Sequence, residues 1–421
     1  MKETSFMTVI PADEEDLRPE KLIERISQSR IVKVYGSERD MSDENSPISL
    51  KISIDDRNYT VNLSMAEPDF PDFFRTVHFF SDLDFQKIEK IEKALTVEID
   101  YTDDFVASYH DQLKIINCLV PDKLAVVDLP SEKILSGKWV KLAAESDIPP
   151  APRYLYTAQA ITNDSGEVWI HSHGLRRCGL PDLEILGSNR DMAQVHYQIL
   201  ENAAIHMIDE ERCPEEGEPT LLARLAEGVP MITVLADWED ALKLYPDATV
   251  GTEDDRDEYH AEGTKVIMLY LNAEDMENGK ISRIQELDKY LGRNTMFMIS
   301  HKETERMRSL ARERIDYVCK VSDQLDSGVE VLMKLGLRVD DEYLQPETDP
   351  DEQREHIWFT LKAVEQDEEG PIFICELMQE PYYVKAMQKG STGSFRVTDV
   401  TDWAIFRDEK KYTPDDAYLI G

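Results

Sequence analysis

The sequence predicts an α+β protein with a ferredoxin-like N-terminal layer, an α/β-type middle domain and a small β-rich C-terminal module. Three observations support this prediction. Over residues 5–101, strand-like and helix-like segments follow one another in the order β-α-β-β-α-β. Three prolines within residues 148–152 cannot continue a helix and indicate a boundary. A run of acidic residues at 340–355 then separates the last part of the chain.

The N-terminal domain, residues 1–148, is expected to contain a hairpin covered by helices. Two segments that alternate apolar and polar residues, 50–54 and 59–63, flank a polar turn. Apolar residues at spacings of three and four predict helices, one of them capped by Asp82. The predicted strands are 5–10, 31–35, 50–54, 59–63, 96–101 and 124–129, and the predicted helices are 17–29, 82–94, 106–116 and 132–144.

The middle domain, residues 153–339, begins with a second predicted hairpin. Its strands are 153–161 and 167–173, and the turn is Asn163-Asp164-Ser165-Gly166. An apolar stripe predicts a helix over 189–207, and Ser300 is expected to cap a long helix that ends near Leu325. Further strands are predicted at 183–186, 229–235, 265–271 and 296–299.

The acidic linker, residues 340–355, holds eight acidic residues opposed only by Arg354. Like charges and prolines favour a solvated, extended segment. The C-terminal module, 356–421, is expected to contain two strand pairs, 358–361 with 373–377 and 394–397 with 403–406. A module this short has a small core, so Trp358 and Trp403 are expected to supply much of it.

The chain carries 85 acidic and 47 basic residues, a formal charge of −38. This charge argues against general nucleic-acid binding, because no excess of lysine and arginine is present to displace counterions from phosphates. It also disfavours docking on anionic membranes, and it favours a basic protein as partner. No secretory signal or bilayer-length apolar run is seen, and the five cysteines are scattered. A cytoplasmic location is therefore expected, while the oligomeric state is left open.

No signature for a named reaction is found. The chain lacks a Walker-type phosphate loop, a GxGxxG motif, an HExxH motif and a GxSxG motif. We therefore expect a protein-interaction or immunity-type binding protein that uses acidic surfaces, or, equally, a chain whose charge only maintains its solubility. The alternative, from a different class, is a metal-dependent hydrolase centred on the strand that contains His171 and His173.

The histidine pair is the sharpest candidate site. Strand side chains alternate, so Trp169, His171 and His173 share one face of the strand 167–173. Two imidazoles at this spacing can chelate one metal ion, and Cys178 and Glu184 follow closely enough to complete a zinc site. In the simpler interpretation, the histidines pack beside the tryptophan and bond to carboxylates. The default expectation is thus no cofactor, with zinc as the possible one.

Arg176 and Arg177 stand out in an acidic chain. Together with Trp169 and the histidine strand, they are candidates for an anion-binding or partner-binding surface. The alternative is that they form salt bridges with Asp182 and Glu184. Cys178 is also a candidate for a nucleophile activated by a histidine, and the alternative is a buried structural cysteine.

The C-terminal residues resemble a known family. The run Glu380-Pro381-Tyr382-Tyr383-Val384, then Lys389-Gly390, then Val397 to Asp402-Trp403, resembles the YegJ-like bacterial domain of unknown function. The segment Trp169-Ile170-His171-Ser172-His173-Gly174-Leu175 resembles a larger uncharacterised bacterial family that is often joined to that module. These resemblances imply an architecture and a place to look for a site, but no reaction, cofactor or catalytic residue.

Overall fold

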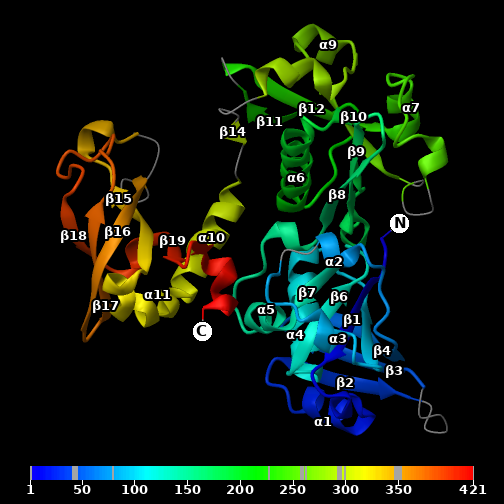
Figure 1. The fold of residues 1–421 in the computed structure, drawn as a ribbon, viewed down its shortest axis with the longest axis horizontal. Coiled ribbons are helices and arrows are strands. Elements are labelled where there is room, and N and C mark those ends of the chain that lie inside the picture. The colour runs from blue at the N-terminus through cyan, green and yellow to red at the C-terminus, as the bar shows by residue number, and fades with distance from the viewer. Residues whose placement is uncertain are drawn as a thin grey trace. The chain divides into compact units, whose positions relative to one another are not determined.

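A computed structural model describes residues 2–39, 46–77, 80–225, 228–256, 260, 263–291, 296–297, 300–345 and 353–420 (Figure 1). Within them the chain forms three mostly antiparallel sheets with helices, so the predicted α+β class is confirmed. Two compact units are present. The first contains Met1–Glu145 and Pro149–Ser300, and the second contains Ser146–Ile148 and His301–Gly421. No helix in the described ranges combines the length and apolar character that crossing a membrane requires.

The first sheet has the strand order β2-β3-β4-β5-β1-β6-β7, and all its neighbouring strands are antiparallel. Strands β3 and β4 form the predicted hairpin around Asp55 and Asp56, and their inward residues are buried. The ferredoxin-like layering stays a prediction. The strands are β1 Ser5–Pro11, β2 Val32–Glu38, β3 Ile48–Ile54, β4 Arg57–Ala66, β5 Ala94–Ile99, β6 Lys123–Asp128 and β7 Lys133–Ser136, and the helices are α1 Pro19–Ser27, α2 Phe74–Val77, α3 Phe85–Ile88, α4 Phe105–Leu119 and α5 Gly137–Ala144.

Two helix predictions in this region were wrong. The helix expected over 82–94 is the single turn of α3, capped by Asp84, and Asp82 instead accepts a hydrogen bond from Ser136. The helix expected over 132–144 begins only at Gly137. The preceding residues form β7, because all four are buried and pair with β6. Ser136 then caps α5 through two backbone N–H groups.

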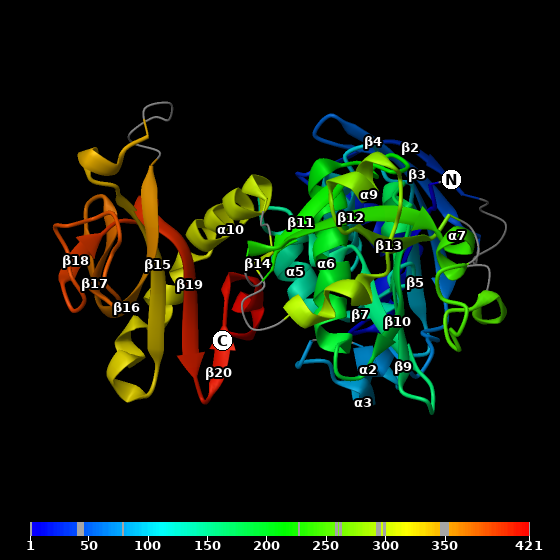
Figure 2. The same ribbon diagram turned by 90° about the horizontal axis from the view of Figure 1, so that it is seen from above.

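The second sheet has the order β14-β11-β12-β13-β10-β9-β8. Only β10 and β13 are parallel to each other among its described pairs. Helix α6 contacts β8, β9, β10 and β11, and it stands beside these strands in Figures 1 and 2. The elements are β8 Thr157–Thr162, β9 Glu167–His173, β10 Leu183–Asn189, α6 Ala193–Glu210, β11 Thr220–Arg224, β12 Pro230–Asp237, α7 Trp238–Leu242, β13 Lys265–Tyr270, α9 Ala273–Glu277 and β14 Met296–Phe297. Residues 298–299 of the strand expected at 296–299 lie outside the described ranges.

The third sheet belongs to the second unit and has the order β18-β17-β16-β15-β19-β20. It begins earlier than residue 356, because β15 lies between β16 and β19 and is hydrogen-bonded to both. The expected long helix is divided at Arg314 into α10 and α11. The elements are α10 His301–Glu313, α11 Ile315–Val321, β15 Glu330–Arg338, β16 Arg354–Asp367, β17 Gly370–Leu377, β18 Thr392–Phe395, β19 Val400–Arg407 and β20 Lys410–Tyr412.

Pairing in the third sheet is only partly as expected. Strands β16 and β17 form the first predicted pair around an acidic turn. The second predicted pair does not form, because β18 pairs with β17 while β19 pairs with β15 and β20. Trp403 is fully buried, whereas Trp358 is only half-buried. Residues 346–352 of the expected acidic linker lie outside the described ranges.

Candidate metal centre

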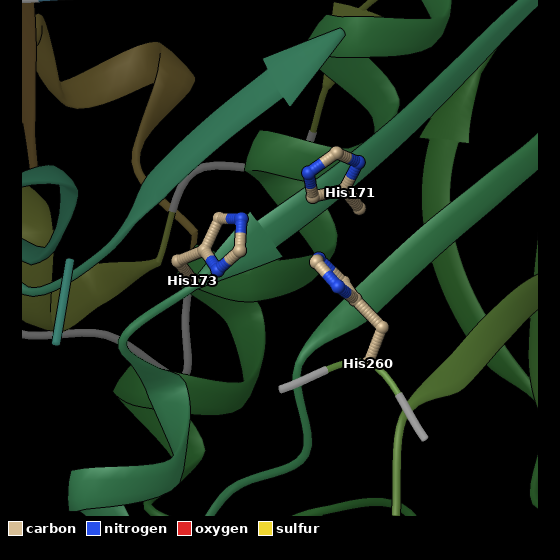
Figure 3. A group of neighbouring side chains, drawn as sticks. All are labelled: His171, His173 and His260. Carbon is tan, nitrogen blue, oxygen red and sulfur yellow. The ribbon is translucent and has the colours of Figure 1, made fainter. Parts of the chain in front are cut away.

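Three buried histidines lie together in the first unit: His171 and His173 on β9, and His260 between β12 and β13 (Figure 3). Each offers one ring nitrogen, and these three nitrogens lie within 4.8 Å of one another. The ring centroids are 4.8 to 4.9 Å apart, with steeply inclined planes. Three convergent imidazoles are a donor set that can hold one transition-metal ion.

The geometry of β9 explains why two of these rings point the same way. Side chains alternate along a strand, so Trp169, His171 and His173 lie on one face, as the sequence predicted. The indole ring of Trp169 packs 4.3 Å from the ring of His171 and 5.1 Å from that of His260. The tryptophan thereby places an apolar surface beside these two imidazoles.

The neighbouring strands place polar residues on the same face. Glu184 of β10 and Gln159 of β8 are the cross-strand partners of His171, and Thr157 of β8 is the partner of His173. Directly opposed residues share a face of a sheet, so these side chains surround the histidine pair.

His260 reaches the strand because an arginine fixes its backbone. One terminal nitrogen of Arg256 donates a hydrogen bond to the carbonyl oxygen of His260 at 3.0 Å. The other donates a hydrogen bond to the carbonyl oxygen of Gly251 at 3.2 Å. Gly251 has a φ of 73°, and a Cβ atom there would lie 2.9 Å from the indole of Trp169. Only glycine therefore allows the chain to pass this close to the site.

Burial keeps His171 in its neutral form. Desolvation is the main cause that lowers the pKa of His171 well below its usual value. The neighbouring groups His173, His260 and Arg256 lower it further by charge repulsion. A neutral imidazole is the form that binds a metal. Its Nδ1 atom has no hydrogen-bond partner among the described residues, and neither has the buried hydroxyl of Thr157. Unsatisfied buried polar atoms at one place are costly, and a bound ion would satisfy the nitrogen.

The donor set fits zinc or a similar borderline ion. Zinc binds histidine nitrogen at about 2.0–2.1 Å, so ligand atoms of a tetrahedral site are about 3.3 Å apart. The three nitrogens, now within 4.8 Å, can reach this spacing by small ring movements. Three histidines would leave one coordination position for a further ligand or water.

The residues expected to complete the ligand set have other roles. Glu184 is fully buried. Its carboxylate accepts hydrogen bonds from both terminal nitrogens of Arg256, at 2.6 and 2.8 Å, and from the indole N–H of Trp169 at 3.1 Å. Cys178 is buried, and desolvation raises the pKa of its thiol to about 12. The group of convergent ligand atoms contains neither residue.

Two of the three residues expected to form an anion-binding or partner-binding surface lie in the interior, and Arg176 is partly buried. Trp169 and Arg177 are buried, and Arg177 donates to both carboxylate oxygens of Asp128 at 2.6 and 2.8 Å. Arg176 lies 3.2 Å from Glu3 and 3.8 Å from Asp182. Both arginines therefore form salt bridges, but of the two expected partners only Asp182 takes part, because Glu184 pairs with Arg256.

His260 is the site residue that sequence reasoning missed. It follows an acidic loop and lies far from β9 in the sequence, so spacing gives no signal for it. Arg256 within that loop was the available hint, since a lone arginine among acids suggests a buried partner.

A second constellation includes serine, histidine and aspartate. The hydroxyl of Ser188 lies 2.8 Å from Nδ1 of His196, and Nε2 of that ring lies 2.9 Å from Asp288. Ser188 and His196 are fully buried, so no substrate carbonyl can reach the hydroxyl. We interpret this row of hydrogen bonds as a structural link between β10, α6 and the 3-10 helix Ile284–Tyr290.

Comparison with known families gives two matches. Residues 5–150 match the model described as protein of unknown function (DUF4026) N-terminal, and residues 158–268 match its C-terminal counterpart. Together these segments span more than half of the chain. The chain belongs to the DUF4026 family. The family has no stated function, so the expectation of an uncharacterised family is confirmed, and the three histidines lie within the DUF4026 C-terminal segment. No curated protein and no solved structure matches the chain.

Proposed function

We propose that this protein binds one transition-metal ion, zinc by preference, through His171, His173 and His260. The observation that supports the proposal most directly is the convergence of three buried ring nitrogens within 4.8 Å. Nitrogen-rich sites favour zinc and its borderline neighbours over magnesium or calcium, which prefer oxygen ligands. The formal charge of −38 also favours attraction of cations to the chain.

Metal content tests this proposal. Protein purified without chelator, and protein reconstituted with zinc, should contain about one metal ion per chain. His171→Ala/His173→Ala and His260→Ala should each lose most of it. His301→Ala is the matched control, because His301 is exposed at the start of α10, outside the cluster. Equal, near-zero metal in wild type and variants would overturn the proposal.

A metal-dependent hydrolase is the catalytic version of the same site. The ligand count favours it, because catalytic zinc sites keep three protein ligands and a water molecule. Burial opposes it, because the three rings are 1 to 8% exposed and a substrate must reach the metal. Hydrolysis of activated esters or phosphate esters that is lost in His260→Ala would favour this version.

A binding role for the acidic surface is a separate proposal, supported by the net charge alone. A basic protein would associate faster at low salt, and this gain would fall as ionic strength rises. Capture experiments at low and high salt test it, and salt-independent capture or no capture would count against it.

We further propose that residues 356–421 include a YegJ-like module and that the protein is bacterial and cytoplasmic. The support is the sequence resemblance of residues 380–403, which form parts of the third sheet. The DUF4026 segments end at residue 268 and do not include these residues.

A further inference from the structure

A carboxylate from the first sheet faces the histidine cluster. Oε2 of Glu132 lies 3.5 Å from Nε2 of His173, and the side-chain amide of Gln159 donates to the same oxygen at 2.6 Å. Glu132 lies between β6 and β7, within the DUF4026 N-terminal segment. Gln159 belongs to β8 and is the cross-strand partner of His171. The contact therefore connects the DUF4026 N-terminal segment with the DUF4026 C-terminal segment at the candidate metal centre.

The spacing of this contact resembles that of two ligands on one metal ion. Ligand atoms in a tetrahedral zinc site are about 3.3 Å apart. Glu132 is not part of the convergent group of ligand atoms, so its carboxylate must turn toward the rings to bind the same ion. Its side chain is 22% exposed, so the carboxylate is not fully enclosed by neighbouring atoms.

Glu132 has a strained backbone conformation beside the histidine cluster. Its φ is 52°, in the left-handed region that residues other than glycine seldom adopt. On the opposite side, Gly174 follows His173 with a φ of 107°, and a Cβ atom there would lie 3.0 Å from Cβ of Ser131. A strained turn and a glycine thus bring β9 and the 131–132 turn into close contact. Strain of this kind is concentrated at functional sites.

Electrostatics also favours Glu132 as a ligand. A divalent ion held by three neutral imidazoles keeps its full charge in a buried place, where the cost of an unpaired charge is high. The carboxylate of Glu184 is already neutralised by Arg256. Glu132 brings a second carboxylate to the cluster, 3.5 Å from His173, and its negative charge would offset part of the charge of the ion.

We propose that Glu132 is the fourth ligand of the metal centre, which closes its coordination and links the two DUF4026 segments. This inference rests on the proposed metal site. It makes the centre a His₃Glu site of the closed type, which is typical of structural metals, and leaves no position for a catalytic water. The ion would then act as a clamp between the first and second sheets.

Azide binding to the cobalt-substituted protein tests the closure. Co²⁺ bound at a zinc site reports its ligands through visible absorption. With Glu132 bound, azide has no free position, so the wild-type spectrum should not change when azide is added. In Glu132→Ala the position opens, and azide should change the spectrum. Glu132→Gln should bind cobalt at least about tenfold more weakly than wild type, since even outer-sphere partners of ligands contribute 10–100-fold.

The control is Glu211→Ala, which removes a glutamate with the same left-handed backbone, at φ 55°, from an exposed position after α6. It should keep wild-type affinity and no response to azide. A wild-type spectrum that already responds to azide would overturn the role of Glu132 without any variant and would favour the open, hydrolase-type centre. Unchanged affinity in both Glu132 variants would also overturn it. If wild type binds no cobalt, the metal proposal itself fails, and the role of Glu132 fails with it.

Discussion

Arg256 donates its two terminal nitrogens to the two carboxylate oxygens of Glu184, at 2.6 and 2.8 Å, and both side chains are almost completely buried. The same guanidinium packs 4.2 Å from the ring of Trp238 and donates to the carbonyl oxygen of His260. Glu184 belongs to β10 and lies across from His171. This ion pair therefore fixes His260 relative to the strand that provides the other two histidines.

Glu184→Gln should weaken both the fold and the metal centre. It leaves the guanidinium of Arg256 buried without its counter-charge, and loss of one partner of a buried pair costs about 3–5 kcal/mol. Urea unfolding of chelator-treated protein measures this loss, and zinc titration should show weaker binding because His260 is less firmly placed. Glu218→Gln is the control: its ion pair with Arg212 is exposed, so stability should hardly change. Equal effects of the two substitutions would contradict the assigned role of Glu184.

The sequence predicts the strand part of the site and not the loop part. Alternation along β9 is a local property, so it correctly places Trp169, His171 and His173 on one face. Proximity in the sequence predicts Cys178 and Glu184 as the further ligands, and this prediction uses local information alone. The actual third member, His260, is brought in by a long-range ion pair, for which a single sequence contains no periodic signal.

The fold shows the same division between local and long-range information. The hairpins β3–β4 and β8–β9 were predicted because turn residues and alternation are local. Segment 133–136 is a strand only because β6 lies beside it. Strands β18 and β19, which were expected to pair with each other, lie at different places in the third sheet because β15 is inserted between β16 and β19. Tertiary pairing of this kind overrides local propensity.

His110 should make stability depend on pH. Its Nε2 donates to the carbonyl oxygen of Ala143 at 2.8 Å, and burial lowers the pKa of the ring to about 4. The unfolded chain takes up this proton near pH 6.5. Between pH 6.5 and 4 the unfolded state therefore binds more protons, so the free energy of unfolding falls as pH falls, by about 3 kcal/mol in total. Above pH 6.5 this contribution is fully present.

Urea unfolding of chelator-treated protein at pH 7 and at pH 5 checks this prediction. His110→Gln keeps a donor for Ala143 but does not titrate, so its stability should change less between the two values. His301→Gln, which alters an exposed histidine, should keep the wild-type difference. A wild-type pH dependence in His110→Gln would show that the ring is not protected from protonation.

Trp403 should be the most important single side chain of the second unit. It is fully buried on β19, and its indole N–H donates to the carbonyl oxygen of Ala311 on α10 at 2.9 Å. Trp403→Ala should destabilise this unit by about 3–5 kcal/mol, the usual cost of a large core truncation. Amide hydrogen exchange of β15 and β19 in the full chain measures it. Trp358→Ala, at a half-buried position, should have the smaller effect, and the reverse order would show that the core lies elsewhere.

The third sheet should require β15 in order to fold. Val331, Met333 and Leu335 of this strand are completely buried, and its backbone pairs with β16 on one side and β19 on the other. A fragment of residues 301–421 retains α10, α11 and all six strands of the sheet. A fragment of residues 356–421 lacks β15 and leaves two strands with unpaired edges and exposed apolar faces. We expect the longer fragment to unfold cooperatively in urea, as followed by circular dichroism, and the shorter one to show no cooperative transition. Cooperative unfolding of the shorter fragment would mean that β16 and β19 can pair without the strand between them, and that the sequence boundary at residue 356 marks an independent module after all.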